Sequence, residues 1–224
     1  MARYFTTFVE YGTGAAPSDW TERWSVTNTA PSVESGGDDQ MLVITNATSP
    51  EDHLLSWNVI DADADRATVE ILCKIKTASV TAGIVHCGVA FRGAGTTSAL
   101  EGYMVAIYGD DLRLYKGGGG SAPTSIASVA LTLTTTVWYW LLVRASGDSL
   151  KAKISSSGIP DGSSWDIDVT DSSHTAAGWV GAYSNSTAAD PSYDFFGVGT
   201  AGDAAPAERQ NPSKLLCLGV GGGN

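Results

Sequence analysis

Three aspartates stand at alternate positions of the sequence, Asp61, Asp63 and Asp65. Carboxylates at positions i, i+2 and i+4 have the spacing of an oxygen-ligand loop that holds Ca²⁺. An EF-hand loop also needs Gly at its sixth position and Glu at its twelfth, where this chain has Arg66 and Leu72. The string is therefore not an EF-hand, and two interpretations stay open: a structural calcium site, or a charged turn before the next strand.

Other residue patterns that carry enzyme chemistry are missing from the sequence. The histidines lie far apart, without the spacing that binds zinc. The sequence has no Gly-x-Ser-x-Gly motif, and the glycine run at 117–120 lacks the Lys-Ser/Thr of a phosphate-binding loop. A second acidic string, Asp166, Asp168 and Asp171, favours a polar edge strand with a solvated face. We therefore predict no catalytic residues, and a structural calcium ion is the one cofactor considered.

A binding surface is a better candidate than a reaction centre. Strand alternation places several aromatic and charged residues opposite the predicted core, or on a strand nearby. They are Glu70, His86, Arg92, Trp140, Arg144 and Trp57. Aromatic rings with a few hydrogen-bonding groups suit a sugar-type ligand. The footprint of a neighbouring subunit is the alternative, since Trp and Arg dominate interface centres, and core packing is the third interpretation for any single tryptophan.

The element that positions several of these residues is a β-hairpin predicted over residues 137–154. Its first arm, 137–145, is a continuous apolar run, and its second arm alternates apolar residues with Lys151 and Lys153. A Ser-Gly-Asp cluster at 146–148 supplies the turn. Because both faces of the first arm are apolar, we expect a second sheet to cover one face and loops, a ligand or a partner to cover the other.

The remaining chain repeats this strand pattern. Residues 66–77 alternate as a half-buried strand, and residues 84–93 do the same with small residues on the face opposite the core. Two further strands meet at Gly109-Asp110, a plausible tight turn. A polar Gly/Ser/Asp stretch over 32–40 leads into an apolar run. About a dozen strand candidates separated by turn residues are typical of a two-sheet antiparallel β-sandwich or jelly roll.

Residues 1–200 are therefore expected to form one all-β domain, and residues 201–224 an extended Pro/Gly-rich tail. The tail holds an apolar group that we interpret as an assembly or docking element. Its members are Leu215, Leu216, Leu218 and Val220.

Charge and composition exclude some functions. The formal net charge is -11, which disfavours a nucleic-acid partner. No apolar run is long enough for a membrane-spanning helix, and the start lacks the apolar core of a secretory signal, so we expect synthesis in a cytoplasm. Cys73 and Cys87 fall at core-facing positions, where reduced, buried thiols are favoured over a bridge between the two.

Five segments together resemble the concanavalin A-like (laminin G-like) jelly-roll superfamily. They are the residues at 103–105, LRLYK at 112–116, WYWLLVRASGDSLKAKI at 138–154, GWVGAYS at 178–184 and YDFFGVGTAG at 193–202. The resemblance covers most of residues 1–200 and implies the fold more strongly than an activity. Hydrolases of this superfamily carry a Glu-x-Asp-x-(x)-Glu string, which the three aspartates at 166–171 match poorly, and many members hold a structural calcium ion.

The resemblance also implies a setting. Such domains serve as carbohydrate-binding modules, glycoside-hydrolase scaffolds and adhesive or decorating parts of bacteriophage particles. Our leading expectation is a non-catalytic virion decoration protein, made in the host cytoplasm, with a lectin-like face outward. Its partners would be other virion proteins or copies of itself, with surface glycans as a further partner. An extracellular carbohydrate-binding module or adhesin is the alternative, and a glycoside hydrolase is the third.

Overall fold

The computed structural model describes residues 2–25, 30–45, 52–77, 79–81, 83, 85–94, 100–118, 122–185 and 190–207. These residues form strands and one short helix. The elements are β1 (Arg3–Thr6), β2 (Trp20–Ser25), β3 (Ser32–Gly36), β4 (Asp39–Val43), β5 (Asp52–Trp57), α1 (Asn58–Asp61), β6 (Val69–Lys76), β7 (Val85–Ala94), β8 (Glu101–Tyr108), β9 (Asp111–Gly118), β10 (Thr124–Ala130), β11 (Tyr139–Ser146), β12 (Ser149–Ser155), β13 (Ile167–Thr170), β14 (Trp179–Asn185) and β15 (Ser192–Thr200).

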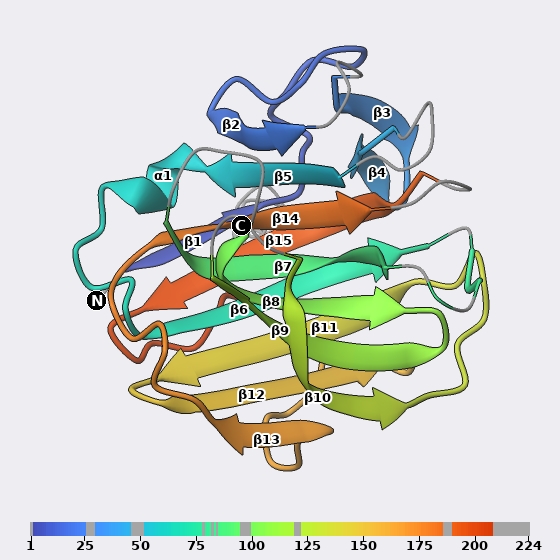
Figure 1. The fold of residues 1–224 in the computed structure, drawn as a ribbon. Helices are drawn as coiled ribbons and strands as arrows, with labels where there is room; N and C mark the ends of the chain where they lie inside the picture. Colours follow the sequence, from blue (N-terminus) through green and yellow to red (C-terminus); the bar gives the residue numbers. More distant parts are fainter. Residues whose placement is uncertain are drawn as a thin grey trace, which may run out of the picture.

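The strands form two antiparallel sheets packed face to face (Figure 1). Sheet A has the order β13-β12-β11-β6-β15-β4-β3, with β1 also paired to β15. Sheet B has the order β10-β9-β8-β7-β14-β5-β2. The prediction of an all-β, two-sheet sandwich is therefore confirmed. Because many neighbouring strands are distant in sequence, each sheet is assembled from both ends of the chain.

The hairpin at 137–154 is confirmed as β11 and β12. The two strands pair from Trp140 with Ser155 to Ser146 with Ser149, which leaves Gly147 and Asp148 as a two-residue turn. Gly147 has φ +58°, a conformation that glycine adopts without strain. The predicted turn at Gly109-Asp110 joins β8 to β9 in the same way.

Both apolar faces of β11 are covered, as its sequence predicts. Leu141 and Val143 belong to the core between the sheets, opposite Cys73 and Ile71 of β6. The outer face carries a second cluster that contains Trp140, Leu142, Phe195 and Ala205 (described below as the outer cluster). The cover on this side comes from the chain itself, because the segment after β15 runs back over sheet A.

That segment, residues 201–206, is packed closely against β15. A Cβ atom on Gly199 would lie 2.3 Å from the carbonyl oxygen of Asp203, and one on Gly197 would lie 3.1 Å from that of Pro206. The Nε of Arg3 donates to the carbonyl of Ala204 at 3.0 Å. The glycines of β15 therefore allow the segment to lie directly on the sheet. The tail residues Leu215, Leu216, Leu218 and Val220 lie outside the described residues.

Candidate functional site

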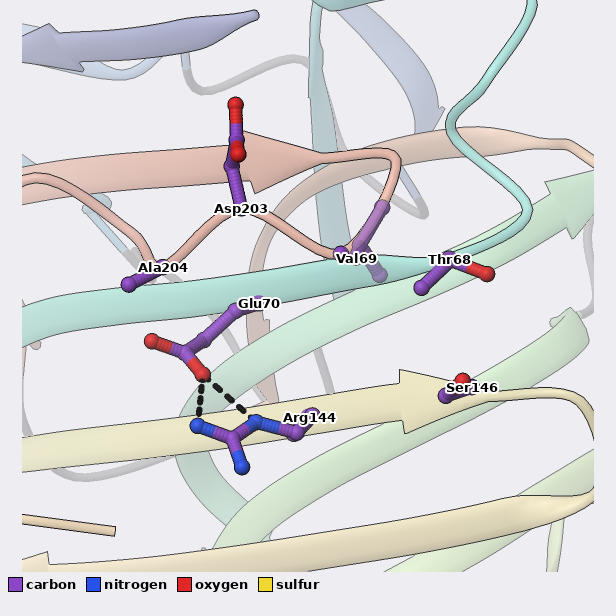
Figure 2. A pocket seen from close by; sticks show the side chains of 8 residues that line it. Thr68, Val69, Glu70, Arg144, Ser146, Asp203 and Ala204 are labelled. Carbon is purple, nitrogen blue, oxygen red and sulfur yellow. Dashed lines mark hydrogen bonds and ion pairs between the residues drawn. The ribbon is translucent and has the colours of Figure 1, made fainter. Parts of the chain in front are cut away.

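A pocket of about 280 Å³ opens on the outer face of sheet A. It lies where β6 begins and β11 ends, under the segment that follows β15. Its lining consists of Thr68, Val69, Glu70, Arg144, Ser146, Gly202, Asp203 and Ala204. Figure 2 shows Glu70 and Arg144 pointing toward each other, while the carboxylate of Asp203 points away from this pair. The pocket is somewhat smaller than the usual 300–1,000 Å³ of small-molecule sites, which suits a single compact ligand group.

The Glu70–Arg144 pair forms the polar wall of the pocket. The two residues are direct cross-strand partners on β6 and β11. The Nε of Arg144 donates to Oε2 of Glu70 at 2.6 Å, and its Nη2 contacts the same oxygen. The other carboxylate oxygen accepts the backbone N–H of Ala205 at 3.1 Å. Both carboxylate oxygens of Glu70 thus have partners and the residue is only 7% exposed, whereas the Arg144 side chain is 43% exposed and has donors left for a ligand.

Aromatic side chains lie next to this wall. The guanidinium carbon of Arg144 lies 5.1 Å from the ring centroid of Trp165, within the range of a cation–π contact. Trp165 is half-buried and packs against the outer cluster, in which Trp140 and Phe195 have ring centroids 5.7 Å apart. The outer face of sheet A therefore combines a charged donor with indole surfaces, and it brings together Trp140, Arg144 and Glu70 of the predicted site.

The other three predicted site residues lie elsewhere. Trp57 packs in the core between the sheets, stacked on Trp20 with ring centroids 5.6 Å apart. His86 belongs to β7 of sheet B and is fully buried beside a β-bulge; its Nε2 donates to the carbonyl of Thr81 at 3.1 Å. Burial lowers the pKa of His86. The structure thus corrects the expectation of one shared face, because alternation within a strand does not show which sheet the strand joins.

Arg92 has a structural position rather than an exposed one. A β-bulge at the end of β7 gives it φ +51°, and the residue is 3% exposed. Its Nε donates to the carbonyl of Ala67 at 2.8 Å, and its Nη1 donates to those of Gly147 and His174 at 2.8 and 3.0 Å. Arg92 therefore ties three separate segments together at one end of the sandwich.

Two of the three aspartates considered as calcium ligands, Asp61 and Asp63, have separate partners. Asp61 is paired with Arg23, and Asp63 accepts the hydroxyls of Tyr4 at 3.2 Å and Thr200 at 2.6 Å. Asp63 also accepts the backbone N–H of Asp65. Within the described ranges, no three His, Cys, Asp or Glu residues are grouped as a metal site. The hydrogen bonds from Thr200 and from the backbone N–H of Asp65 lower the pKa of Asp63.

The second acidic string is also dispersed. Asp166 accepts the backbone N–H of Ile154, and Asp168 pairs with Lys151 at 2.8 Å. Asp171 accepts hydrogen bonds from Tyr103 at 2.6 Å and from Lys116 at 2.8 Å. The three carboxylates therefore bond to different strands and loops and do not form one group.

Two residues that contact the Glu70–Arg144 pair, Trp165 and Ala205, were not predicted from the sequence. Trp165 follows a Gly/Ser-rich stretch, and the Ala205 N–H belongs to a segment that was expected to form part of a tail. The sequence feature that could have indicated Trp165 is its position just before β13, because β13 pairs with β12 of the hairpin. Nothing local in the sequence indicates that residues 201–206 turn back over sheet A.

Comparisons with known proteins rest on the fold. No family model matches the sequence, and no curated protein matches it. Solved structures match at low identity: the exoplasmic/lumenal domain of VIP36 in its Ca²⁺/Man-bound form has a TM-score of 0.58 and 11% identity, covering 83% of this chain and 84% of that one. Carbohydrate binding module CBM66 from Bacillus subtilis has a TM-score of 0.53 and 14% identity, covering 81% and 96%.

The carbohydrate recognition domain of Emp46p matches similarly, with a TM-score of 0.52 and 13% identity over 81% of this chain and 88% of that one. In the described part of the chain, no helix is long and apolar enough to cross a membrane. The chain has the lectin-like β-sandwich fold shared by these carbohydrate-binding proteins.

Proposed function

We propose that the protein is a non-catalytic carbohydrate-binding protein and that a sugar residue binds in the pocket beside Arg144. The observation that carries this proposal is the half-exposed guanidinium of Arg144, held at the pocket wall by Glu70 and next to the indole of Trp165. A sugar ring has hydroxyl groups on its rim and C–H groups on its faces. It therefore needs fixed polar groups beside an apolar surface.

The donors for sugar hydroxyls come from Arg144. A guanidinium has five N–H donors, and the contacts with Glu70 involve Nε and Nη2. Nη1 makes no hydrogen bond that the described residues show, so it is available to a ligand oxygen. The hydroxyls of Thr68 and Ser146 lie on the lining of the same pocket. Because the pair with Glu70 already fixes the Arg144 side chain, little side-chain conformational entropy is lost when a ligand binds.

The charge of the pocket favours a neutral sugar. The positive charge of Arg144 is balanced by Glu70, and the carboxylate of Asp203 lies nearby without pointing at the pair. The whole chain carries a formal net charge of -11, which disfavours polyanionic glycans at long range. We therefore expect hydroxyl-rich, uncharged saccharides to bind better than uronic or sulfated ones.

Structural neighbours support this ligand class, since they include VIP36 in a Man-bound form and a carbohydrate binding module from Bacillus subtilis. A virion setting is compatible with the proposal, because a decoration protein that displays sheet A outward would bring the pocket to host glycans. The proposal itself rests on carbohydrate binding alone.

A glycan array tests the proposal. The intact chain and the variant Arg144→Met are labelled and applied to neutral, acidic and sulfated glycans, with calcium and with EDTA. We expect the intact chain to bind a subset of the neutral glycans and the variant to lose that signal. Absence of binding to every glycan, or an unchanged pattern in the variant, would refute the proposal.

A further inference from the structure

A second pocket, of about 270 Å³, lies at one edge of the sandwich. At this edge β10 ends the order of sheet B and β13 ends the order of sheet A, and the two strands contact each other (Figure 1). The pocket, described below as the edge pocket, lies between the loop that follows β10 and the end of β12. Its lining consists of Leu131, Thr132, Leu133, Tyr139, Ile154, Ser155, Ser156 and Ser157.

The loop that forms one wall of the edge pocket is held in place by two hydrogen bonds. The backbone N–H of Thr134 donates to the hydroxyl oxygen of Tyr139 at 2.8 Å, and the N–H of Thr136 donates to the carbonyl of Thr77 at 3.0 Å. Thr136 has φ +67°, a conformation that β-branched residues rarely adopt. The surrounding contacts therefore hold this loop in one shape, and little loop ordering is left to oppose the binding of a ligand.

The apolar part of the edge pocket is continuous with the core between the sheets. Tyr139, the first residue of β11, is 6% exposed and belongs to that core. Leu131, Leu133 and Ile154 pack against the same core but are only half-buried. The pocket therefore offers apolar side-chain surface to the C–H groups of a ligand.

Hydroxyl groups form the rest of the lining. The hydroxyl oxygens of Ser155 and Ser157 lie 3.1 Å apart, and the backbone N–H of Ser157 donates to Ser155 at 3.2 Å. Thr132 and Ser156 are exposed, and their hydroxyls make no hydrogen bond to another residue in the described part of the chain. Because a hydroxyl both donates and accepts, these groups can pair with a ligand hydroxyl in either direction.

The lining of the edge pocket suits a neutral ligand that is rich in hydroxyl groups. Five of the eight lining residues carry a side-chain hydroxyl, and none carries a charge at neutral pH. An anion such as phosphate would find no Arg or Lys among them. A hydrocarbon chain would bury their hydroxyl groups without partners, which costs free energy. A saccharide residue has both the C–H faces and the hydroxyl groups that this lining can contact.

We propose that the edge pocket is a second saccharide site, which binds one neutral sugar residue between Tyr139 and the hydroxyls of Thr132 and Ser156. It has the same ligand class as the proposed function but shares no lining residue with the Arg144 pocket, so either site can fail alone. Neutral hydrogen bonds are about half as strong as charge-assisted ones. We therefore expect millimolar affinity, weaker than at Arg144, and a gain in avidity for glycans that reach both sites.

An NMR titration tests the proposal residue by residue. Proton–nitrogen correlation spectra of the intact chain are recorded with increasing D-mannose, D-glucose, D-galactose or N-acetylglucosamine. We expect at least one of these sugars to cause saturable shifts of the backbone amides at 131–133 and 154–157, and these shifts should persist in Arg144→Met. Absence of saturable shifts at these positions with every sugar would overturn the proposal. Shifts confined to 68–70 and 144–146 would support the Arg144 pocket alone and would likewise overturn it.

Two variants test whether the hydroxyls of the edge pocket hold the sugar. Thr132→Val and Ser156→Ala remove exposed hydroxyls that bond to no described residue, so both variants should fold as the intact chain does. Each should raise the dissociation constant of the sugar at the edge pocket several-fold. Thr134→Val is the matched control, because Thr134 lies on the same loop but does not line the pocket. Dissociation constants in both variants equal to that of the control would overturn the proposal.

Discussion

Glu70 and Arg144 are cross-strand neighbours on β6 and β11, and the carboxylate of Glu70 joins three parts of the protein. One oxygen accepts from Arg144, and the other accepts the backbone N–H of Ala205. A single side chain therefore shapes the pocket wall and fastens the segment after β15 to sheet A.

Replacement of Glu70 by Ala should lower the free energy of unfolding by about 2 kcal/mol, because the Ala205 N–H and the Arg144 guanidinium both lose an acceptor. Arg144→Ala should cost less, about 1 kcal/mol or below, since Arg144 is 43% exposed and solvent screens the pair. Urea unfolding measures both values. The exposed Glu10→Ala is the control, and a loss in Glu70→Ala no larger than in this control would contradict the assignment.

Stability should depend on Asp171 in acid. Burial alone would raise the pKa of Asp171, but hydrogen bonds from Lys116, Tyr103 and Ser173 outweigh burial and lower the pKa well below its ordinary value of 3.8. A lowered folded-state pKa stabilises the fold above pH 3.8, and this contribution is lost as the pH falls toward the folded-state pKa. In urea unfolding, Asp171→Asn should be clearly destabilised near about pH 6, and its difference from wild type should shrink progressively as the pH falls from about 4 toward the folded-state pKa. A difference that stays constant with pH would exclude this role.

Arg92→Lys should destabilise the fold by about 3 kcal/mol, since lysine lacks the planar fork that reaches three carbonyl groups. Arg113→Lys provides the matched control because Arg113 is only partly buried and pairs with the neighbouring Asp111. Thermal or urea unfolding of both variants checks this prediction. Similar stabilities for the two would mean that the carbonyl contacts of Arg92 contribute little.

Two glycines in strands should respond differently to alanine. A Cβ atom on Gly181 would lie 1.7 Å from the carbonyl oxygen of Leu55, whereas one on Gly118 would meet nothing within 4 Å. Gly181→Ala should therefore cost about 1–3 kcal/mol or more, because backbone of β5 must move. Gly118→Ala should be tolerated. Equal midpoints of urea unfolding in the two variants would show that β14 and β5 can separate without cost.

The fold was predictable where local signals suffice. The hairpin of β11 and β12 follows from an apolar run, a glycine turn and strict alternation, all within about 20 residues of sequence. The polar stretch at 32–40 gave no such signal, yet it forms β3 and the start of β4 because these strands lie at the edge of sheet A. An edge strand tolerates polar residues on both sides, so period-two alternation is weak there.

The site was predictable only in part, because strand pairing between distant segments cannot be seen in one sequence. Glu70 and Arg144 are 74 residues apart and meet because β6 pairs with β11. His86 and Arg92 also alternate with core-facing residues in the sequence, but their strand, β7, belongs to sheet B. A β-bulge at each residue interrupts the alternation, so neither residue lies on the outer face. The pocket also needs Asp203 and Ala204, whose position depends on packing against Gly199.

Titration calorimetry with the strongest neutral oligosaccharide from the array tests the central claim most directly. The intact chain should bind it, Arg144→Met and Trp165→Ala should each weaken binding at least about tenfold, equivalent to about 1.4 kcal/mol, and Arg113→Met on sheet B should bind as the intact chain does. All variants are first shown to be folded by circular dichroism. Unchanged affinity in both Arg144→Met and Trp165→Ala would contradict the claim that this pocket binds carbohydrate.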